Sequence, residues 1–360
     1  MIVYKSTIET FTTDVETGII EEVIEAKYNA TLNRRVSKNE KRSWQNSMMY
    51  MNTVLTDYEI PLDAGINIEM QIPQTSKRID FIITGKNRSK KDHAVIVELK
   101  QWETAEKTGM DGIVKTFIGG GNREVSHPSY QAWSYAALLN DFNEAVYDGD
   151  IQLEACAFLH KYHSNGVLDD PFYRDHTEKA PVFMKKDITK LREYIKSFIK
   201  YGDSDNIIYR IEDGRIRTSK MLADSLSSML KGNEEFIMID EQKLAFEYVM
   251  DAVLNRQKGQ KRVVIIEGRP GTGKSVVAIN LLVKLTAKNR FVSYIPKNSA
   301  PRTVYASMLT GDMKKSHVNN IFKSSGSFTN TESNLFDALI VDEAHRLNEK
   351  SGPTGRICGS

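Results

Sequence analysis

A glycine-rich loop that follows an apolar segment is the feature of this sequence that most constrains its fold. The segment Arg262–Ile266 is β-branched after its first residue, and the loop reads Gly268-Arg269-Pro270-Gly271-Thr272-Gly273-Lys274-Ser275. The motif G-x-x-x-x-G-K-S between a strand and a helix is typical of phosphate-binding loops, because backbone N–H groups and the helix N-terminus face the phosphates. We therefore expect a strand over Arg262–Ile266, a helix over Lys274–Lys288 and a bound nucleoside triphosphate with Mg²⁺.

The loop and a second motif supply chemically different groups. We expect Lys274 to reach the β- and γ-phosphates of ATP and Ser275 to ligate Mg²⁺. A further apolar strand, Ala338–Val341, ends in Asp342-Glu343-Ala344-His345. Asp342 is expected to hold the metal through water, and Glu343 to orient and deprotonate the attacking water. A solvated acidic turn is the alternative for this second motif, and its pairing with the loop argues against that alternative.

Other predicted nucleotide contacts come from the loop and from an upstream segment. Glu241–Leu254 has the apolar spacing of an amphipathic helix. Gln242, near its start, carries an amide that can donate and accept at once, which matches the N6–N7 edge of adenine. A glutamine on a helix surface usually has no such role, so this prediction depends on the loop beside it. The loop residues expected to contact the nucleotide are Gly268, Pro270, Gly271, Thr272, Gly273, Lys274 and Ser275.

The order of these motifs resembles that of a superfamily 1 helicase core. Gln242, the phosphate loop, Tyr294–Pro301 and Asp342–His345 are most similar to the helicase domain of bacterial Schlafen group 3-like proteins. The resemblance implies that the loop containing Lys297 and Arg302 contacts single-stranded nucleic acid. The net charge is only +2, so such binding requires a local basic patch. The stretch 284–323 has one acid, Asp312, against Lys284, Lys288, Arg290, Lys297, Arg302, Lys314, Lys315 and Lys323.

The position of the last residue bears on the expected activity. The chain ends 15 residues after His345, whereas the resemblance implies a complete first RecA-like domain and a second one with an arginine finger. We therefore expect a truncated helicase: a fragment, a chain whose missing half comes from a partner or a homo-oligomer, or one that hydrolyses ATP poorly. The terminal stretch 352–360 has no structural signal and is expected to be disordered.

Three charged residues in the first half form a second candidate site. Ile66–Ile72, Arg78–Thr84 and His93–Leu99 read as successive strands. Asp80 lies in the second of these, and Glu98 and Lys100, two positions apart at the end of the third, share one face of a strand. Two carboxylates can bind Mg²⁺ or Mn²⁺, which polarises a scissile phosphate, while an ammonium group activates water. An exposed ion pair between Glu98 and Lys100 is the alternative.

The helix predicted after these strands extends the pattern. Gln131 and Tyr135, four positions apart, share one helix face. The pattern D…ExK…QxxxY resembles the PD-(D/E)xK nucleases of the RecB-like branch. The resemblance implies a restriction-endonuclease-like α/β fold, with Asp80 and Glu98 as metal ligands and Lys100 as the catalytic lysine. Gln131 and Tyr135 would position the substrate or that lysine. Two further candidate acids are Glu69 and Glu40.

The elements along the chain predict an α/β protein of two domains. We expect a PD-(D/E)xK nuclease-like domain over 1–200 and the first part of a RecA-like P-loop domain over 233–360. A helical connector over 201–232 is predicted to include a short hairpin around Asp213-Gly214. No apolar run reaches the roughly 18–20 residues needed to span a bilayer, and no signal peptide is evident, so a cytoplasmic protein is expected. The two cysteines form no zinc motif.

Both halves together predict a nuclease–helicase type of protein. We expect metal-dependent phosphodiester hydrolysis of nucleic acid, DNA in preference to RNA, coupled to or gated by ATP. The resemblance also implies a role in defence against phage or foreign DNA. One alternative is an ATP-dependent regulatory protein that binds nucleic acid through a non-cleaving nuclease fold. A second alternative is an AAA-type ATPase that acts on protein partners.

Overall fold

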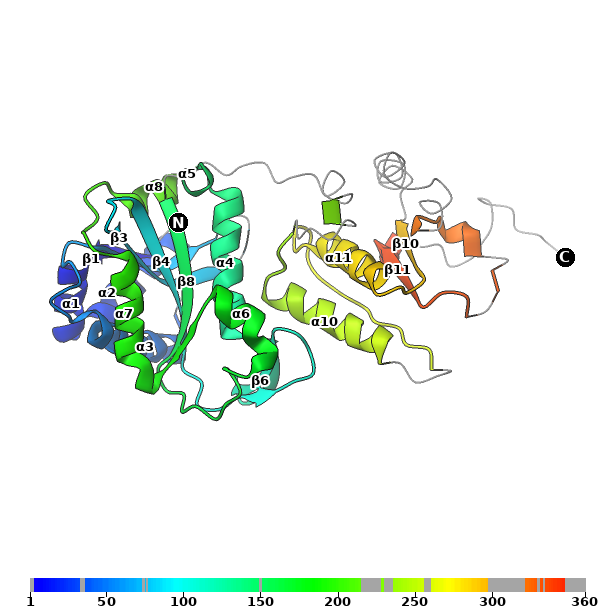
Figure 1. Ribbon diagram of the computed structural model, residues 1–360, viewed down its shortest axis with the longest axis horizontal. Helices are drawn as coiled ribbons and strands as arrows, with labels where there is room; N and C mark the ends of the chain where they lie inside the picture. Colours follow the sequence, from blue (N-terminus) through cyan, green and yellow to red (C-terminus); the bar gives the residue numbers. More distant parts are fainter. Residues whose placement is uncertain are drawn as a thin grey trace. The chain divides into compact units, whose positions relative to one another are not determined.

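The computed structural model divides the chain into two compact units (Figure 1). The first unit comprises Met1–Thr218 and Ile239–Glu241, and the second comprises Ser219–Met238 and Gln242–Ser360. No helix among the described residues is long and apolar enough to cross a membrane. The structure describes residues 3–32, 36–72, 75, 77–148, 151–214, 228–229, 236–255, 260–296, 321–328, 331–332 and 334–346.

A six-stranded mixed sheet forms the centre of the first unit, in the order β1-β2-β3-β4-β8-β9. The pairs from β1 to β4 are antiparallel, and β4, β8 and β9 run parallel. A parallel pair needs a long crossover, and α4 lies in the connection between β4 and β8. The strands are β1 (Tyr4–Thr7), β2 (Gly65–Gln71), β3 (Arg78–Lys86), β4 (Asp92–Lys100), β8 (Ile151–Leu159) and β9 (Val182–Met184).

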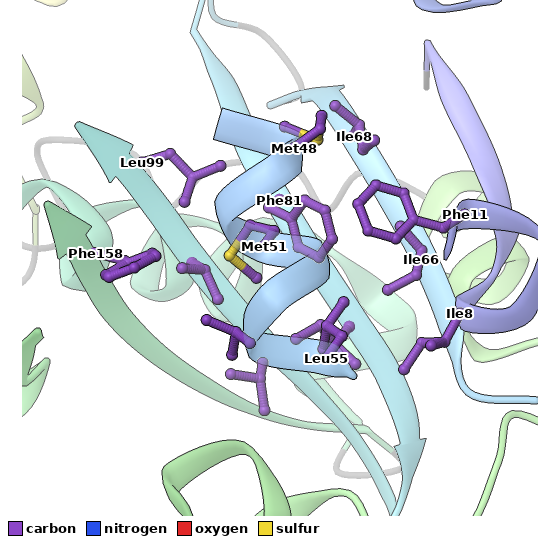
Figure 2. Close-up of a cluster of buried hydrophobic side chains, with 14 of the residues drawn as sticks. Ile8, Phe11, Met48, Met51, Leu55, Ile66, Ile68, Phe81, Leu99 and Phe158 are labelled. Atoms are coloured by element: carbon purple, nitrogen blue, oxygen red, sulfur yellow. The ribbon is translucent and has the colours of Figure 1, made fainter. Parts of the chain in front are cut away.

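Helices cover both faces of this sheet, which explains why β4 reads as an almost continuous apolar run. Val95 and Val97 of β4 join a core cluster with α3 and α7, whereas Ala94 and Ile96 join a second cluster with α4. Figure 2 shows the first cluster, where Met51 and Leu55 of α3 lie over Phe81. The helices of this unit are α1 (Ile8–Glu16), α2 (Ile20–Leu32), α3 (Lys38–Leu55), α4 (Pro128–Phe142), α5 (Glu144–Tyr147), α6 (Arg174–Lys179), α7 (Ile188–Phe198) and α8 (Ile207–Asp213), with 3-10 turns η1 (Pro171–Tyr173) and η2 (Lys185–Asp187).

Two helix starts agree with local signals in the sequence. Ser37 caps α3 by accepting a hydrogen bond from the Glu40 backbone N–H at 3.2 Å, as its capping-box pattern predicts. Pro128 stands in the first turn of α4, where its missing N–H has no helical partner to lose. The three strands predicted as a meander are confirmed as β2, β3 and β4, with shifts of a few residues at their ends.

One segment of the first unit differs from prediction, and another shows regular structure in a polar stretch. The polar stretch 166–180 contains η1 and α6, and Tyr173 of η1 is buried in a satellite core. The hairpin expected at Asp213-Gly214 is absent from the described residues there, since α8 occupies 207–213. Its Ile207, Ile208 and Ile211 pack into the cluster beneath α4. A separate sheet contains β5 (Glu106–Lys107), β6 (Ile113–Ile118) and β7 (Gly121–Ser126), and Gly119 and Gly120 form its turn with positive φ angles.

The second unit has a smaller α/β core. Its strands β10 (Val292–Pro296) and β11 (Ala338–Asp342) pair in parallel, and the second of them confirms the strand predicted over Ala338–Val341. Leu281, Leu282 and Leu285 of α11 are buried in the core cluster that contains these strands. Its described helices and 3-10 turns are α10 (Asp240–Leu254), α11 (Lys274–Ala287), η3 (Ser325–Phe328) and η4 (Ala344–Arg346), of which α10 starts among residues of the first unit.

The strand predicted over Arg262–Ile266 is wrong for this structure. Residues 260–269 have no regular secondary structure, and Val263 and Ile265 are 88% and 77% exposed. A strand exists only where a neighbour satisfies its N–H and C=O groups, and among the described residues this segment pairs with neither β10 nor β11. The β-branched composition is therefore typical of a strand, but among the described residues the segment has no neighbouring strand with which to pair.

Core burial predicts where the first unit tolerates the replacement of a large side chain by alanine. Phe81 of β3 is fully buried, so Phe81→Ala should reduce the free energy of unfolding by about 3–5 kcal/mol. Phe117 of β6 is 62% exposed, and Phe117→Ala should change it by less than about 0.5 kcal/mol. All three tryptophans, Trp44, Trp102 and Trp133, lie in the first unit, so urea unfolding followed by tryptophan fluorescence measures this unit alone. Equal losses for the two variants would contradict the assigned core.

A buried histidine at the start of α4 predicts acid sensitivity. The Ser129 N–H donates to His127 Nδ1, so Nε2 carries the proton and donates to the Leu168 carbonyl. Burial lowers the pKa of His127 from 6.5 to about 4. Below pH 6.5 the unfolded chain therefore takes up a proton that the folded state refuses, and stability is lost progressively down to about pH 4.

Because folded His127 does not take up this proton, the free energy of unfolding should fall by up to about 2 kcal/mol between pH 7 and pH 5. His127→Asn keeps an N-cap acceptor but does not titrate, so its urea unfolding curves should shift less over this interval. His163→Asn, at an exposed position, is the control. A wild-type pH dependence in His127→Asn would show that this histidine does not contribute to the acid sensitivity.

Candidate functional sites

The phosphate loop leads directly into α11. Gly271 and Gly273 have φ angles of 78° and 80°, a left-handed conformation that glycine adopts without strain. Gly273 is the N-cap of α11, so the free N–H groups of the first turn point toward the loop. Lys274 Nζ donates to the carbonyls of Gly268 at 2.8 Å and Arg269 at 3.0 Å. The lysine ammonium is thus held over the loop, where phosphate oxygens can replace the two carbonyls.

The structure brings the end of β11 to the start of α11. Ser275 Oγ donates to Asp342 Oδ2 at 3.0 Å, although 67 positions separate the two residues. The same oxygen accepts from Tyr294 Oη at 2.7 Å, and Asp342 Oδ1 accepts from the Glu343 N–H at 3.0 Å. Parallel pairing of β10 with β11 places Asp342 opposite Pro296. A hydroxyl and a carboxylate in contact are the oxygen ligands that Mg²⁺ accepts beside a nucleotide.

The structure also places two other predicted site residues of the second unit, Gln242 and Glu343. Gln242 Nε2 donates to the Thr272 carbonyl at 2.9 Å and is 2.4 Å from the point where a Cβ on Gly273 would lie. Glu343, with φ 53°, has Oε2 3.4 Å from His345 Nε2 and is 44% exposed. The predicted nucleic-acid contacts Lys297 and Arg302 lie outside the described residues.

The acidic residues of the first unit meet where β3 and β4 separate. Their ladder ends at Phe81–Val97, and Asp80 and Glu98 are the next residues along each strand. Asp80 Oδ2 accepts from the Leu99 N–H at 2.8 Å, in place of a ladder bond. Lys100 Nζ contacts Glu98 Oε1 at 2.6 Å. Glu98 is 1% exposed, so the alternative of a solvent-exposed ion pair is wrong.

Both β2 and β3 change faces beside this site. Ile66 and Ile68 of β2 belong to the first core cluster, whereas Met70, of the same parity, belongs to the second. In β3, Phe81 and Ile79 likewise belong to different clusters. A regular strand keeps residues of one parity on one face, so both strands are distorted in between.

The distortion falls on two acidic residues, Glu69 and Asp80. Pairing passes from Ile68–Phe81 to Met70–Ile79 and omits them, and Glu69 has φ 59°. Glu69 accepts from Trp44 Nε1 at 2.8 Å and pairs with Arg78 at 3.0 Å. Burial and the nearby charge of Asp80 raise the pKa of Glu69 to about 7. Backbone strain of this kind persists where the surroundings hold it, often at functional sites.

The electrostatics of the carboxylate pair fit a divalent cation. Burial raises the pKa of Asp80, and burial together with the charge of Asp80 raises that of Glu98 well above its usual range. Burial would lower the pKa of Lys100, but the charges of Glu98 and Asp80 raise it. Glu98 Oε2 is buried and has no hydrogen-bond partner among the residues that the structure describes. A cation bound by both carboxylates would satisfy this oxygen and favour both charged forms.

Among the described residues, the candidate metal site offers two carboxylate ligands, Asp80 and Glu98. No group of three histidine, cysteine, aspartate or glutamate residues able to hold a metal occurs among the described residues. Mg²⁺ commonly takes only one or two carboxylates from a protein and completes its octahedron with water and substrate phosphate. The pair Asp80 and Glu98 therefore fits Mg²⁺ or Mn²⁺ that is shared with a nucleic-acid phosphate.

Gln131 and Tyr135 join this region from α4. Gln131 Nε2 donates to Tyr135 Oη at 2.9 Å, and the buried hydroxyl donates in turn to Asp240 Oδ2 at 2.6 Å. Burial is the first cause of a raised Tyr135 pKa, and the charges of Glu98 and Asp240 add to it. Sequence reasoning missed Asp240 here, as well as Tyr294 at the phosphate loop. The sequence signal for Asp240 was its place directly before the predicted helix Glu241–Leu254, which in the structure begins at Asp240.

Comparison with known proteins finds a similarity for part of the second unit. Residues 261–359 match the family described as Schlafen group 3, DNA/RNA helicase domain. This range contains both the phosphate loop and the Asp342–His345 motif, and it supports the predicted α/β fold with a P-loop module. The match indicates ATP use and nucleic-acid-related activity for this part of the chain. Neither the curated proteins nor the solved structures gave a match.

The contacts of Lys274 predict its effect on nucleotide binding. Lys274→Met removes the ammonium group that would otherwise face the phosphates, and it should weaken binding of a fluorescent ATP analogue by at least about tenfold. Lys288→Met, at the exposed C-cap of the same helix, is the matched control and should bind as the wild type does. Unchanged affinity in Lys274→Met, measured by anisotropy titration with Mg²⁺, would contradict this role of the loop.

Proposed function

We propose that this chain is a metal-dependent nuclease whose cutting unit is joined to an ATP-binding helicase-type unit. The observation that carries the nuclease part is the cluster of buried Glu98 with the half-buried Asp80 and Lys100, in which one Glu98 oxygen has no partner among the described residues. Burying such charges is unfavourable by several kcal/mol per ion unless a partner compensates. A divalent cation and a phosphodiester supply that compensation.

The side chains have separate roles in cleavage. Asp80 and Glu98 hold Mg²⁺ or Mn²⁺, which when bound polarises the scissile phosphate and lowers the pKa of an attacking water. Lys100, close to Glu98, donates to a phosphate oxygen or to that water and stabilises the negative charge that develops. Tyr135 and Gln131 are hydrogen-bonded to each other and orient the substrate beside the lysine. Glu69, whose pKa is raised to about 7 by burial and by the charge of Asp80, is a further acid of this site and pairs with Arg78.

The ATP-binding part of the proposal rests on the phosphate loop. Gly268–Ser275 binds ATP, Ser275 and Asp342 hold its Mg²⁺, and Glu343 orients the water that attacks the γ-phosphate. Gln242 recognises adenine, and the segment containing Lys297 and Arg302 contacts nucleic acid. ATP binding by this unit gates cleavage, with DNA as the preferred substrate.

The carboxylate site predicts a metal-dependent and lysine-dependent cleavage. Glu98→Gln removes a metal ligand and Lys100→Met removes the ammonium group, so each should reduce the cleavage rate at least about 100-fold. EDTA should abolish wild-type cleavage, and added Mg²⁺ or Mn²⁺ should restore it. The measurement is product formation from single- and double-stranded DNA and RNA by the full chain.

A second Glu–Lys pair on β5 and β6 supplies matched controls. Glu106 and Lys115 pair at 3.0 Å on the surface, with side chains 63% and 39% exposed. Glu106→Gln and Lys115→Met should therefore cleave as the wild type does. Equal cleavage by Glu98→Gln and the wild type would favour the alternative of a non-cleaving fold that binds nucleic acid.

A further inference from the structure

The first residue after β4 anchors the end of that strand to α3. The strand ends at Lys100, and Gln101 follows it directly. Gln101 Nε2 donates to the Ser43 carbonyl at 2.8 Å and to Ser43 Oγ at 2.7 Å. A third contact of the same amide, with Ser47 Oγ, measures 3.3 Å. Because Ser43 and Ser47 lie four positions apart on α3, one side chain ties the strand end to one face of that helix.

The same network reaches the neighbouring strand β8. Lys100 pairs with Leu159, so Gln101 and His160 are the next residues along these two parallel strands. Ser47 Oγ lies 3.1 Å from His160 Nε2 and therefore bridges Gln101 and His160. Both Ser47 and His160 are buried. The three elements α3, β4 and β8 thus meet in one chain of hydrogen bonds beside Lys100.

This polar cluster is unfavourable for a protein core. His160 is fully buried, and burial lowers its pKa from 6.5 to about 4, so its ring is neutral at pH 7. Its Nδ1 has no hydrogen-bond partner among the described residues. A buried polar atom without a partner destabilises the folded state. Apolar side chains at these positions would avoid that loss, so stability alone does not explain the cluster.

Lys100 is the residue whose position this network determines. Its Nζ contacts Glu98 Oε1 at 2.6 Å and lies 5.9 Å from the centre of the Trp102 ring. Trp102 is buried in the satellite core, so Gln101 and Trp102 anchor the chain beyond Lys100 to two different parts of the first unit. The lysine side chain is a flexible four-carbon stem. Its ammonium group is therefore placed accurately only if the backbone that carries it is held still.

We propose that Gln101 is a positioning residue for the carboxylate site: its hydrogen bonds to α3 fix the end of β4 and so hold the Lys100 ammonium group beside Glu98. The inference rests on the proposed nuclease function and adds a residue outside the pattern D…ExK…QxxxY. Gln101 acts through the backbone that it shares with Lys100. Catalysis depends steeply on placement, and a displacement of about 1 Å can slow a reaction about 100-fold.

The experiment compares Gln101→Met with Gln152→Met in the full chain. Methionine has nearly the length of glutamine but donates no hydrogen bond, and Gln152, exposed on β8, is the matched control. Gln101→Met should lower kcat for DNA cleavage at least about tenfold and change KM by less than about twofold, because the substrate still binds but the lysine is misplaced. Gln152→Met should cleave as the wild type does. Ser43→Ala should cause a smaller loss, because its backbone carbonyl still accepts from Gln101.

A double variant and a metal titration distinguish the positioning of Lys100 from general damage. If Gln101 acts through Lys100, cleavage by Lys100→Met/Gln101→Met should be no slower than by Lys100→Met alone. The Mg²⁺ concentration that gives half the maximal rate should be the same in Gln101→Met and the wild type, because Asp80 and Glu98 are unchanged. Multiplied losses in the double variant, an altered Mg²⁺ requirement or an unchanged kcat in Gln101→Met would overturn the positioning role while the nuclease function stands.

A further readout does not depend on cleavage. Acetylation of lysines followed by mass spectrometry measures how readily each amine leaves its contacts. Lys100 is 17% exposed and paired with Glu98, so its acetylation should be slow in the wild type and at least about threefold faster in Gln101→Met. Lys115, which is 39% exposed, should react equally in both proteins. Faster acetylation of Lys100 in the variant, without cleavage by the wild type, would overturn the nuclease function and leave the positioning role standing. Unchanged acetylation of Lys100 would overturn the positioning role.

Discussion

The clustering of buried Glu98 with the half-buried Asp80 and Lys100 is the constraint on which the first unit depends. Asp80 and Glu98 lie where β3 and β4 stop pairing, and β2 and β3 change faces beside them. An apolar arrangement of this sheet would keep regular alternation and a continuous ladder. The distortion at Glu69 and the orphaned oxygen of Glu98 are costs that stability alone does not explain. A bound ligand that carries positive charge would compensate for both costs.

In the second unit, contacts from several elements converge on one carboxylate. Asp342 accepts from both Ser275 and Tyr294, so the end of β11, the start of α11 and β10 converge on a single side chain. The matched helicase-domain segment spans these elements. A metal ion bound to Asp342 would replace the hydrogen bonds from the two hydroxyl groups by stronger contacts with the cation. Binding of a nucleotide with its metal would therefore rearrange the hydrogen bonds of Ser275 and Tyr294.

The sequence predicted elements where local and tertiary preferences agree. The capping box at Ser37, Pro128 at the start of α4 and the three apolar strands all have signals within a few residues. Prediction from the sequence failed where tertiary contacts determine the local structure. Ile207, Ile208 and Ile211 form one buried face only because the cluster beneath α4 receives them, and Arg262–Ile266 reads as a strand but has no ladder partner among the described residues. Spacing predicted that Glu98 and Lys100 share a strand face, because they are two residues apart. No spacing connects Tyr135 to Asp240.

The Tyr135–Asp240 contact fixes the α4 side of the carboxylate site within the first unit. A hydrogen bond to a charged group contributes about 1.5–3 kcal/mol, so this contact holds the Tyr135 hydroxyl more firmly than a neutral partner would. Because Gln131 donates to the same hydroxyl, the three residues form one chain of hydrogen bonds. Loss of the Asp240 carboxylate would therefore release both α4 side chains that lie beside Glu98.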